Sequence, residues 1–337
     1  MLRVHSANGS VPTLQPEAAS AAVAASPAIQ TIELTKRYGT MAAVAGLTMT
    51  VPRGEVFGFL GPNGAGKTTS VKLLLGLTRP SAGQALVLGA PAGDRLTRRR
   101  IGYLPELFRY QAWLSAREVL TFHCELAGVS SNQRRTEVNA ALDVVGLVSR
   151  ANDRVGTFSK GMQQRLGLGV ALLGRPDLVF LDEPTSALDP VGRHDVREVI
   201  RGLKQRGTTV FLNSHLLSEV EQVCDRVAVV DRGRVIAIGT LEALLGGAKS
   251  VRIRIAGLNG VGEAGLRHYG QVDIEGEWYT IRGVDTDSVP ALVAGVVQLG
   301  GRIYAVEPRH ETLEDRFLQI LGGDTDGGAN HRATNPA

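Results

Sequence analysis

The stretch that decides the fold is EVFGFLGPNGAGKTT, residues 55–69. Its first half, residues 55–61, is an apolar run that ends in glycine, which predicts a strand buried on both faces of a parallel sheet. Its second half has the spacing G-x-x-x-x-G-K-[ST], which predicts a phosphate-binding loop between a strand and a helix. A chance match is the alternative, but only six lysines occur in the chain, so composition alone yields such a match in about one of a hundred similar sequences.

The residue types of this loop suit a nucleotide. Gly61, Gly64 and Gly66 let backbone N–H groups curl around phosphate oxygens, and the N-terminus of the following helix adds positive potential. Lys67 is predicted to reach the outer phosphates, and Thr68 to supply a hydroxyl to Mg²⁺. The remaining residues of the predicted nucleotide-binding loop are Pro62, Asn63, Ala65 and Thr69.

A second apolar run, DLVFLDEP at 177–184, ends in two acids. Asp182, at the carboxyl end of this predicted strand, can hold Mg²⁺ directly or through water. Glu183, beside it, can orient or deprotonate an attacking water. A strand that merely ends in solvated acids is the alternative, and the phosphate loop elsewhere in the same chain makes it the weaker one.

Further segments carry a resemblance to the ATP-binding cassette (ABC) ATPases. FSKGMQQRL at 158–166 resembles the LSGGQ signature of that family, and it precedes the acidic strand as the family requires. Tyr38 in LTKRYG resembles the aromatic residue that stacks on adenine, SALD at 186–189 resembles the D-loop, and His215 resembles the switch histidine. These elements occur in the family's order between about residues 30 and 240.

The resemblance implies that ATP and Mg²⁺ bind, and that hydrolysis depends on Lys67, Glu183 and His215. His215 would sense the γ-phosphate and position Glu183 and a water. In the family the signature acts across a dimer interface, on the ATP held by the partner's phosphate loop, so one subunit alone lacks half of its site. The implied nucleotide-binding residues of the signature and the D-loop are Ser159, Lys160, Gly161, Met162 and Asp189.

Two departures from the family pattern stand out. Glu106 occupies the position of the Q-loop glutamine after IGYLP, where it can still meet Mg²⁺ or water but, when ionised, donates no hydrogen bond. In the signature, Lys160 replaces a glycine and Met162 replaces a glutamine. Both variants resemble those of cassette ATPases that work with separately encoded permeases of the drug-export type.

The expected fold is α/β. The resemblance implies a P-loop NTPase cassette with a RecA-like parallel sheet, a β subdomain and a helical insert at about 105–175, all within residues 29–245. Residues 249–321 are expected to form an α+β accessory domain of β-α-β-β-α-β order, similar to a ferredoxin-like module. EPRHETLEDRF at 307–317 resembles the segment that closes cassette ATPases of drug efflux pumps. Residues 1–28 suggest a disordered leader, with a signal peptide as the alternative, and 322–337 a loose tail.

The composition limits the classes of partner that the chain is expected to bind. The net charge of +4 is small and aromatic residues make up only 5%, so no nucleic acid is expected as a partner. The one dense basic run, RLTRRR at 95–100, is interpreted as a solvated face. Cys124 and Cys224 form no CxxC pair, which fits a reduced, cytosolic protein, and no apolar stretch is long enough to span a membrane.

These observations predict the ATP-hydrolysing subunit of an ABC transporter, on the inner face of the plasma membrane. Two copies would close around two ATP molecules and drive a separate permease that exports a small drug-like or lipid-like molecule. An importer ATPase is one alternative, and Glu106 with the C-terminal module favours export. A cassette acting on nucleic acid or ribosomes is another, but such proteins usually carry two cassettes and this chain has one phosphate loop.

Overall fold

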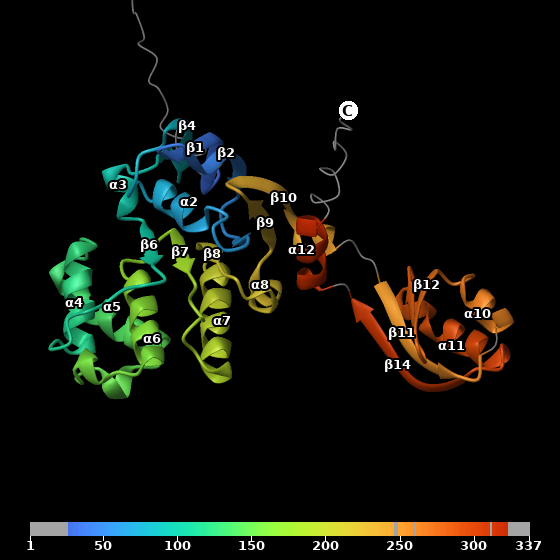
Figure 1. Cartoon of the computed structure of the whole chain (residues 1–337). Coiled ribbons are helices and arrows are strands. Elements are labelled where there is room, and N and C mark those ends of the chain that lie inside the picture. The colour runs from blue at the N-terminus through green and yellow to red at the C-terminus, as the bar shows by residue number, and fades with distance from the viewer. Residues whose placement is uncertain (1–25, 246–248, 259, 311, 323–337) are drawn as a thin grey trace, which may run out of the picture.

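A computed structural model describes residues 26–245, 249–258, 260–310 and 312–322, and most of the predicted leader and tail lies outside them. The chain forms a large N-terminal part with a central sheet, followed by a smaller sheet with two helices against one of its faces (Figure 1). Among the described residues, no helix combines the length and the apolar character that a membrane span needs.

The central sheet has six strands in the order β10-β9-β3-β8-β7-β6. Its strands are β3 (Val56–Leu60), β6 (Ile101–Leu104), β7 (Leu178–Asp182), β8 (Thr209–Asn213), β9 (Arg226–Asp231) and β10 (Arg234–Thr240). All neighbours pair in parallel except β9 and β10, which form a hairpin. The predicted α/β class with a parallel core is therefore confirmed. Because parallel strands end at one edge, the segments after β3, β7 and β8 meet there.

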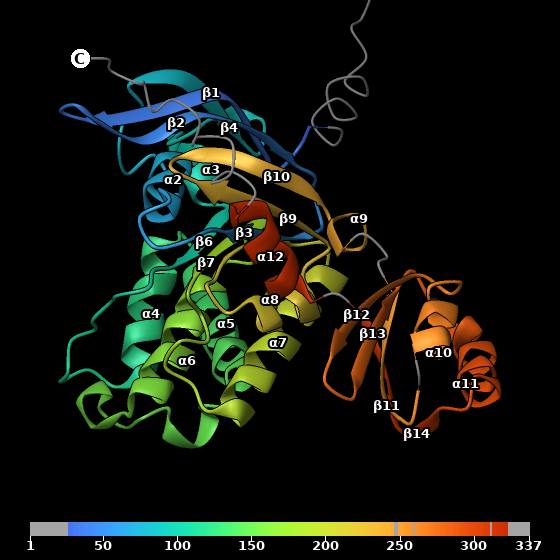
Figure 2. The same cartoon turned by 45° about the vertical axis from the view of Figure 1, so that its right-hand side comes forward.

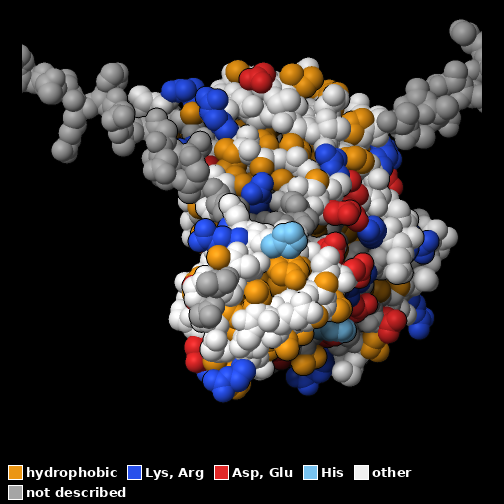
Figure 3. All heavy atoms as spheres, turned by 90° about the vertical axis from the view of Figure 1, so that its right-hand side faces the viewer, with side chains coloured by type: hydrophobic (Ala, Val, Ile, Leu, Met, Phe, Trp, Pro, Cys, Tyr) orange, Lys and Arg blue, Asp and Glu red, His pale blue; other side chains and the backbone are white. Residues whose placement is uncertain are grey.

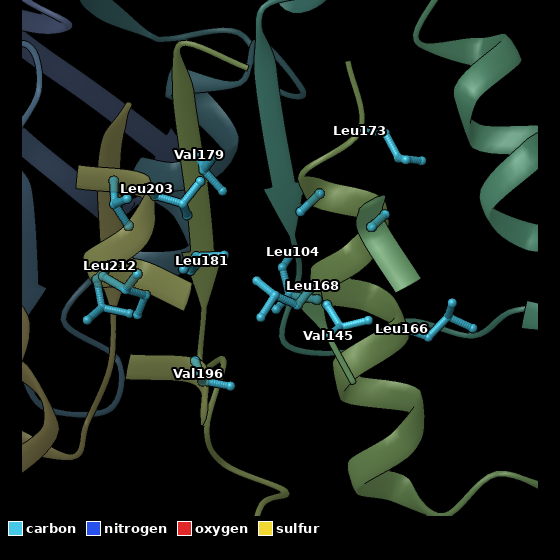
Figure 4. Packing of buried hydrophobic residues seen from close by; sticks show 14 of the residues in the cluster. Leu104, Val145, Leu166, Leu168, Leu173, Val179, Leu181, Val196, Leu203 and Leu212 are labelled. Carbon is cyan, nitrogen blue, oxygen red and sulfur yellow. The ribbon is translucent and has the colours of Figure 1, made fainter. Parts of the chain in front are cut away.

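Apolar side chains bury both faces of this sheet. Phe57, Phe59 and Phe180 each lie against Phe211, with ring centroids 5.2–5.8 Å apart. On the other face, Leu104 of β6 points toward the helices of the insert (Figure 4). Every residue of β3, β7 and β8 is buried, which explains why these strands have continuous apolar runs and no alternation.

An antiparallel sheet in the order β2-β1-β4-β5 packs beside β10 and α2 (Lys67–Leu74) of the core. Its strands are β1 (Ile29–Tyr38), β2 (Met41–Val51), β4 (Ala82–Val87) and β5 (Ala90–Pro91), and the short helix α3 (Arg95–Arg98) follows them. The hairpin between β9 and β10 reaches this sheet, since the N–H of Ala45 donates to Gly233 O at 2.8 Å. The β1–β2 hairpin is thereby held beside α2.

The segment between β6 and β7 is helical, with α4 (Ala116–Leu126), α5 (Ser131–Val144) and α6 (Lys160–Ala171). A capping box between Ser115 and Glu118 starts α4. Close approach of α6 to the sheet depends on Gly102, where a Cβ atom would lie 1.9 Å from the carbonyl oxygen of Ala171. Two further helices lie on the sheet, α7 (Pro190–Gln205) and α8 (Leu217–Val223).

The C-terminal module follows α9 (Leu241–Leu245) and has the expected β-α-β-β-α-β order. Its elements are β11 (Lys249–Ala256), α10 (Gly260–Leu266), β12 (Gln271–Glu275), β13 (Trp278–Arg282), α11 (Val289–Gln298) and β14 (Arg302–His310). The antiparallel sheet has the order β12-β13-β11-β14, that of a ferredoxin-like module. On the face seen in Figure 3, basic side chains lie in small groups among acidic, apolar and uncharged ones.

The last helix, α12 (Leu313–Gly322), does not pack on this module, although sequence analysis assigned it there. It lies against α8 and α9 of the cassette (Figures 1 and 2). Leu313 is 1% exposed and belongs to the hydrophobic cluster of the cassette, and its N–H donates to Glu221 Oε2 at 3.4 Å. Because these contacts join α12 to the cassette, we propose that the cassette includes α12.

Candidate functional site

The loop at residues 61–69 joins β3 to α2 through two left-handed glycines. Gly64 has φ 82° and Gly66, the N-cap of α2, has φ 95°. A Cβ atom on Gly66 would lie 2.1 Å from the carbonyl oxygen of Ala43, and one on Gly61 would lie 2.3 Å from that of Val230. The loop therefore needs glycine both for its backbone angles and for the space between β2 and β9.

Lys67, the first residue of α2, folds back over its own loop. Its Nζ donates to Gly61 O at 2.7 Å and to Pro62 O at 3.1 Å. Burial lowers the pKa of Lys67, while the nearby carboxylates of Glu183, Asp182 and Glu106 act in the opposite direction. The ammonium group is thus partly desolvated, and the surrounding carboxylates favour its charged form.

Asp182 ends β7 with its side chain buried, 2% exposed. Asn213 is its register partner on β8, and Asn213 Nδ2 donates to Asp182 Oδ1. Burial raises the pKa of Asp182, whereas the hydrogen bond from Asn213 lowers it. Asn213 Oδ1 is buried and has no hydrogen-bond partner among the described residues. The pair holds one carboxylate in a fixed direction at the edge where the strands end.

Glu183 and His215 form the closest contact between predicted catalytic side chains. His215 Nδ1 lies 2.7 Å from Glu183 Oε2, and the N–H of His215 donates to Glu183 Oε1 at 3.0 Å. Glu183 is 7% exposed, whereas the side chain of His215 is largely exposed. The histidine therefore covers the carboxylate from the solvent side and fixes both of its oxygens.

These groups line one hollow of about 540 Å³ at the edge of the sheet. Of the predicted site residues, those in its lining are Asn63, Gly64, Gly66, Lys67, Thr68, Thr69, Glu106, Asp182, Glu183 and His215. Gly61, Pro62 and Ala65 form the back of the same loop. Tyr38 is not in the lining. It ends β1, about half exposed, and pairs with Met41, which does line the hollow.

The signature residues lie elsewhere. Ser159 caps α6 by accepting from the N–H of Met162 at 3.2 Å, and Asp189 caps α7 by accepting from that of Gly192 at 2.7 Å. Ser159 and Asp189, together with Arg150, line a second hollow of about 740 Å³. Its lining shares no residue with the first hollow, so the fold of one subunit does not bring the predicted set together in one place. The other predicted members of this second group are Lys160, Gly161 and Met162.

Sequence analysis did not include Asn213 in the site, although it lines the first hollow and holds Asp182. A polar residue that ends a fully buried strand, TVFLN, was the signal. Met41, Ala42 and Ala43 were missed as well, and nothing in their residue types marks them. Their place in the lining follows from the β1–β2 hairpin, which the loop at residues 61–69 packs against.

The residues suit a nucleoside triphosphate and a hard cation. The glycine loop presents main-chain N–H groups at the start of α2, and Lys67 adds positive charge. Thr68 and Asp182 offer oxygen atoms in the same hollow. Within the described ranges no cluster of three or more His, Cys, Asp or Glu side chains forms a metal cage. Mg²⁺ is commonly bound through one or two carboxylates plus substrate phosphates, which fits this donor set.

Comparison with known proteins identifies similar chains. The family described as ABC transporter matches residues 44–186. An uncharacterized ABC transporter ATP-binding protein of Synechocystis is 39% identical, over 87% of this chain and 84% of that protein. The Bacillus licheniformis bacitracin transport ATP-binding protein is 34% identical, over 89% and 99%. The Nod factor export ATP-binding protein I of a Rhizobium species is 38% identical, over 88% and 97%.

Among solved structures, an ATP-binding subunit of an ABC transporter superposes with a TM-score of 0.60. It is 31% identical, and the match covers 64% of this chain and 91% of that subunit. The match therefore leaves about a third of this chain outside the superposed part.

Proposed function

Since the chain belongs to the ATP-binding proteins of ABC transporters, and the motif resemblance is thereby confirmed, we propose that it powers export of a small molecule through a separately encoded membrane permease. The chain binds and hydrolyses ATP, as the ATPase family to which it belongs implies. Export is supported by the relative named for Nod factor export and, less directly, by the one named for bacitracin transport. The residue Glu106 and the C-terminal module support the same direction.

The observation that carries this proposal is the convergence of three segments in one hollow. The glycine loop with Lys67, the acidic end of β7 and the His215 segment after β8 meet there. Phosphoryl transfer depends mainly on positioning and on neutralising charge. A lysine, two carboxylates and a histidine beside a phosphate loop provide those functions.

In the proposed reaction, main-chain N–H groups of the loop and Lys67 hold the phosphate chain of ATP. Thr68, Asp182 and Glu106 would hold Mg²⁺, which neutralises phosphate charge when bound. Glu183 Oε2 is proposed to accept a proton from the attacking water, and His215 keeps the carboxylate turned toward that water. Tyr38 is proposed to lie beside the adenine.

We propose that two copies of the chain complete the sites. The signature hollow, with Ser159 and Lys160, lies apart from the loop that holds the phosphates, and both hollows open to solvent. If each copy turns its signature hollow toward the phosphate loop of the other, two complete sites form. The N-terminus of α6 and the uncharged glycine backbone at Gly161 would then meet the phosphates of the partner's ATP.

A surface for the permease lies on the segment after Glu106 and on α4. Leu107, Trp113, Phe122 and Leu126 are large apolar side chains that are exposed there. Tyr110 links the two elements, since its ring packs edge-on against His123 of α4, with centroids 5.5 Å apart. We propose that a cytoplasmic segment of the permease covers these side chains, which would keep the subunit on the inner face of the plasma membrane.

The substitution Glu183→Gln tests this function. The variant is expected to bind ATP, to accumulate as a closed dimer and to hydrolyse ATP very slowly, because the amide accepts no proton. Phosphate release and size-exclusion chromatography with ATP measure both effects, with Glu198→Gln, an exposed acid on α7, as the matched control. Wild-type turnover by Glu183→Gln would disprove the assignment of the base. Recovery of ribosomes or DNA with no hydrophobic partner, in a pull-down from detergent-solubilised membranes, would disprove the transport role.

A further inference from the structure

The backbone of Glu183 has an unfavourable conformation. Its φ angle is 53°, in the left-handed region that residues with a Cβ atom rarely adopt. The residue is also buried, so its main-chain groups need partners within the protein. Because the side-chain direction follows from these angles, whatever holds the main chain of Glu183 also aims its carboxylate at His215.

Three residues hold that main chain. The N–H of Glu183 donates to Asn213 O at 2.9 Å. Its carbonyl oxygen accepts from Ser186 Oγ at 3.1 Å and from Gln164 Nε2 at 3.3 Å. Asn213 and Ser186 belong to the strand next to Glu183 and to the turn that follows it. Gln164 alone comes from the helical insert, where it is buried, 6% exposed, on α6.

The helix that carries Gln164 is fixed against the edge of the sheet. A Cβ atom on Gly167, one turn further along α6, would lie 2.6 Å from the ring of Phe108 and 2.8 Å from Leu104. With Gly102 approaching the end of the same helix, α6 has little room to shift along β6. The amide of Gln164 therefore reaches Glu183 from a well-supported position, and Phe108 connects that position to the segment after Glu106.

We propose that Gln164 is a positioning residue for ATP hydrolysis: its side-chain amide holds the carbonyl of Glu183 and thereby keeps the carboxylate on His215. This inference rests on the proposed function, in which Glu183 is the base. It makes the placement of the base depend on α6, the helix whose N-terminus forms the signature hollow. Gln164 does not line the hollow of the phosphate loop, so loss of this contact should leave nucleotide binding unchanged.

Gln163, the neighbouring glutamine, has a different hydrogen-bond partner. Gln163 Nε2 donates to Phe158 O at 3.2 Å, so it stabilises the turn that leads into the signature residues. Two adjacent side chains of the same type thus hold different segments, one the signature turn and the other the base. This difference gives a matched pair of variants.

The experiment compares Gln164→Met with Gln163→Met in the full-length chain, and Gln164→Ala serves as a second variant of the first site. For Gln164→Met we expect kcat to fall about tenfold with KM for ATP unchanged, since one hydrogen bond at the base is lost. In a Glu183→Gln background, which traps the dimer, Gln164→Met should dimerise with ATP as fully as the single variant. Gln163→Met should instead weaken ATP-driven dimerisation. Thermal melting gives the folded fraction, and kcat is expressed per folded molecule.

Two results overturn the inference. One is a kcat of Gln164→Met within about twofold of the wild type. The other is a loss of kcat that is matched by an equal loss of ATP-driven dimerisation, because Gln164 would then act through the signature. Failure of the proposed function is distinguishable from both. In that case the wild-type protein hydrolyses no ATP, or Glu183→Gln has no effect.

Discussion

Truncating His215 to alanine removes the side chain whose Nδ1 lies 2.7 Å from Glu183 Oε2. The main-chain N–H of His215, which donates to Oε1 at 3.0 Å, stays in place. The carboxylate thus keeps one of its two hydrogen bonds to this residue. Because His215 covers the carboxylate from the solvent side, its truncation admits water, but a mobile water does not fix the direction of Oε2 as the ring does. The change acts on the direction of the base and leaves the phosphate loop intact.

The size of the effect follows from the type of contact. A hydrogen bond to a charged group contributes about 1.5–3 kcal/mol. If all of it is lost from the transition state, kcat falls about 10- to 150-fold. Because the loop residues that hold ATP are unchanged, KM should change by less than about threefold.

Steady-state phosphate release over a range of ATP concentrations separates the two parameters. His194→Ala is the matched control: this histidine lies on α7, its side chain is 61% exposed, and its Nδ1 lies 3.8 Å from Asp195 Oδ1, away from the hollow. Control activity should equal that of the wild type. A His215→Ala variant with kcat within about twofold of the wild type, or with KM raised and kcat unchanged, would refute the role given to this contact.

Gly66→Ala should abolish binding of a fluorescent ATP analogue, because the new Cβ atom would lie 2.1 Å from the carbonyl oxygen of Ala43 and the φ angle is 95°. The control Gly202→Ala, on α7, should bind the analogue normally, because the space around that position is open. Equal binding by both variants would contradict the geometry of the loop. Burial raises the pKa of Glu55 from 4.5 to about 7, so the folded state holds this proton more tightly and the free energy of unfolding should fall as the pH rises between those values. Glu55→Gln should flatten that slope in urea titrations, and an unchanged slope would rule out this carboxyl as its source.

The residues that could be predicted from sequence are those whose role is local. Gly61, Gly66 and Lys67 sit within one strand-loop-helix unit, so their spacing along the chain already implies their spacing in the fold. Asp182 ends one buried strand and His215 follows another, and because parallel strands end at one edge of the sheet, both residues are expected at that edge. The ABC resemblance then supplied roles that spacing alone leaves open.

Contacts between segments distant in sequence could not be predicted in this way. Asn213 holds Asp182 only because β8 lies next to β7, and Gln164 reaches Glu183 only because α6 packs on the edge of the sheet. α12 was assigned to the accessory domain because it follows β14 in sequence, but its apolar residues pack on α8 instead. These outcomes depend on strand order and on how distant elements pack, which spacing and periodicity along the chain do not specify.

Helix α6 contacts residues of both hollows of a subunit. The N-terminus of α6 lines the signature hollow, and one turn later Gln164 reaches the main chain of Glu183 at the other site. A shift of α6 by about 1 Å would stretch that 3.3 Å contact beyond hydrogen-bond length. ATP binding depends on the local loop after β3, whereas hydrolysis also needs α6 in place. A variant that loses the Gln164 contact should therefore still bind ATP but hydrolyse it more slowly, as expected for Gln164→Met.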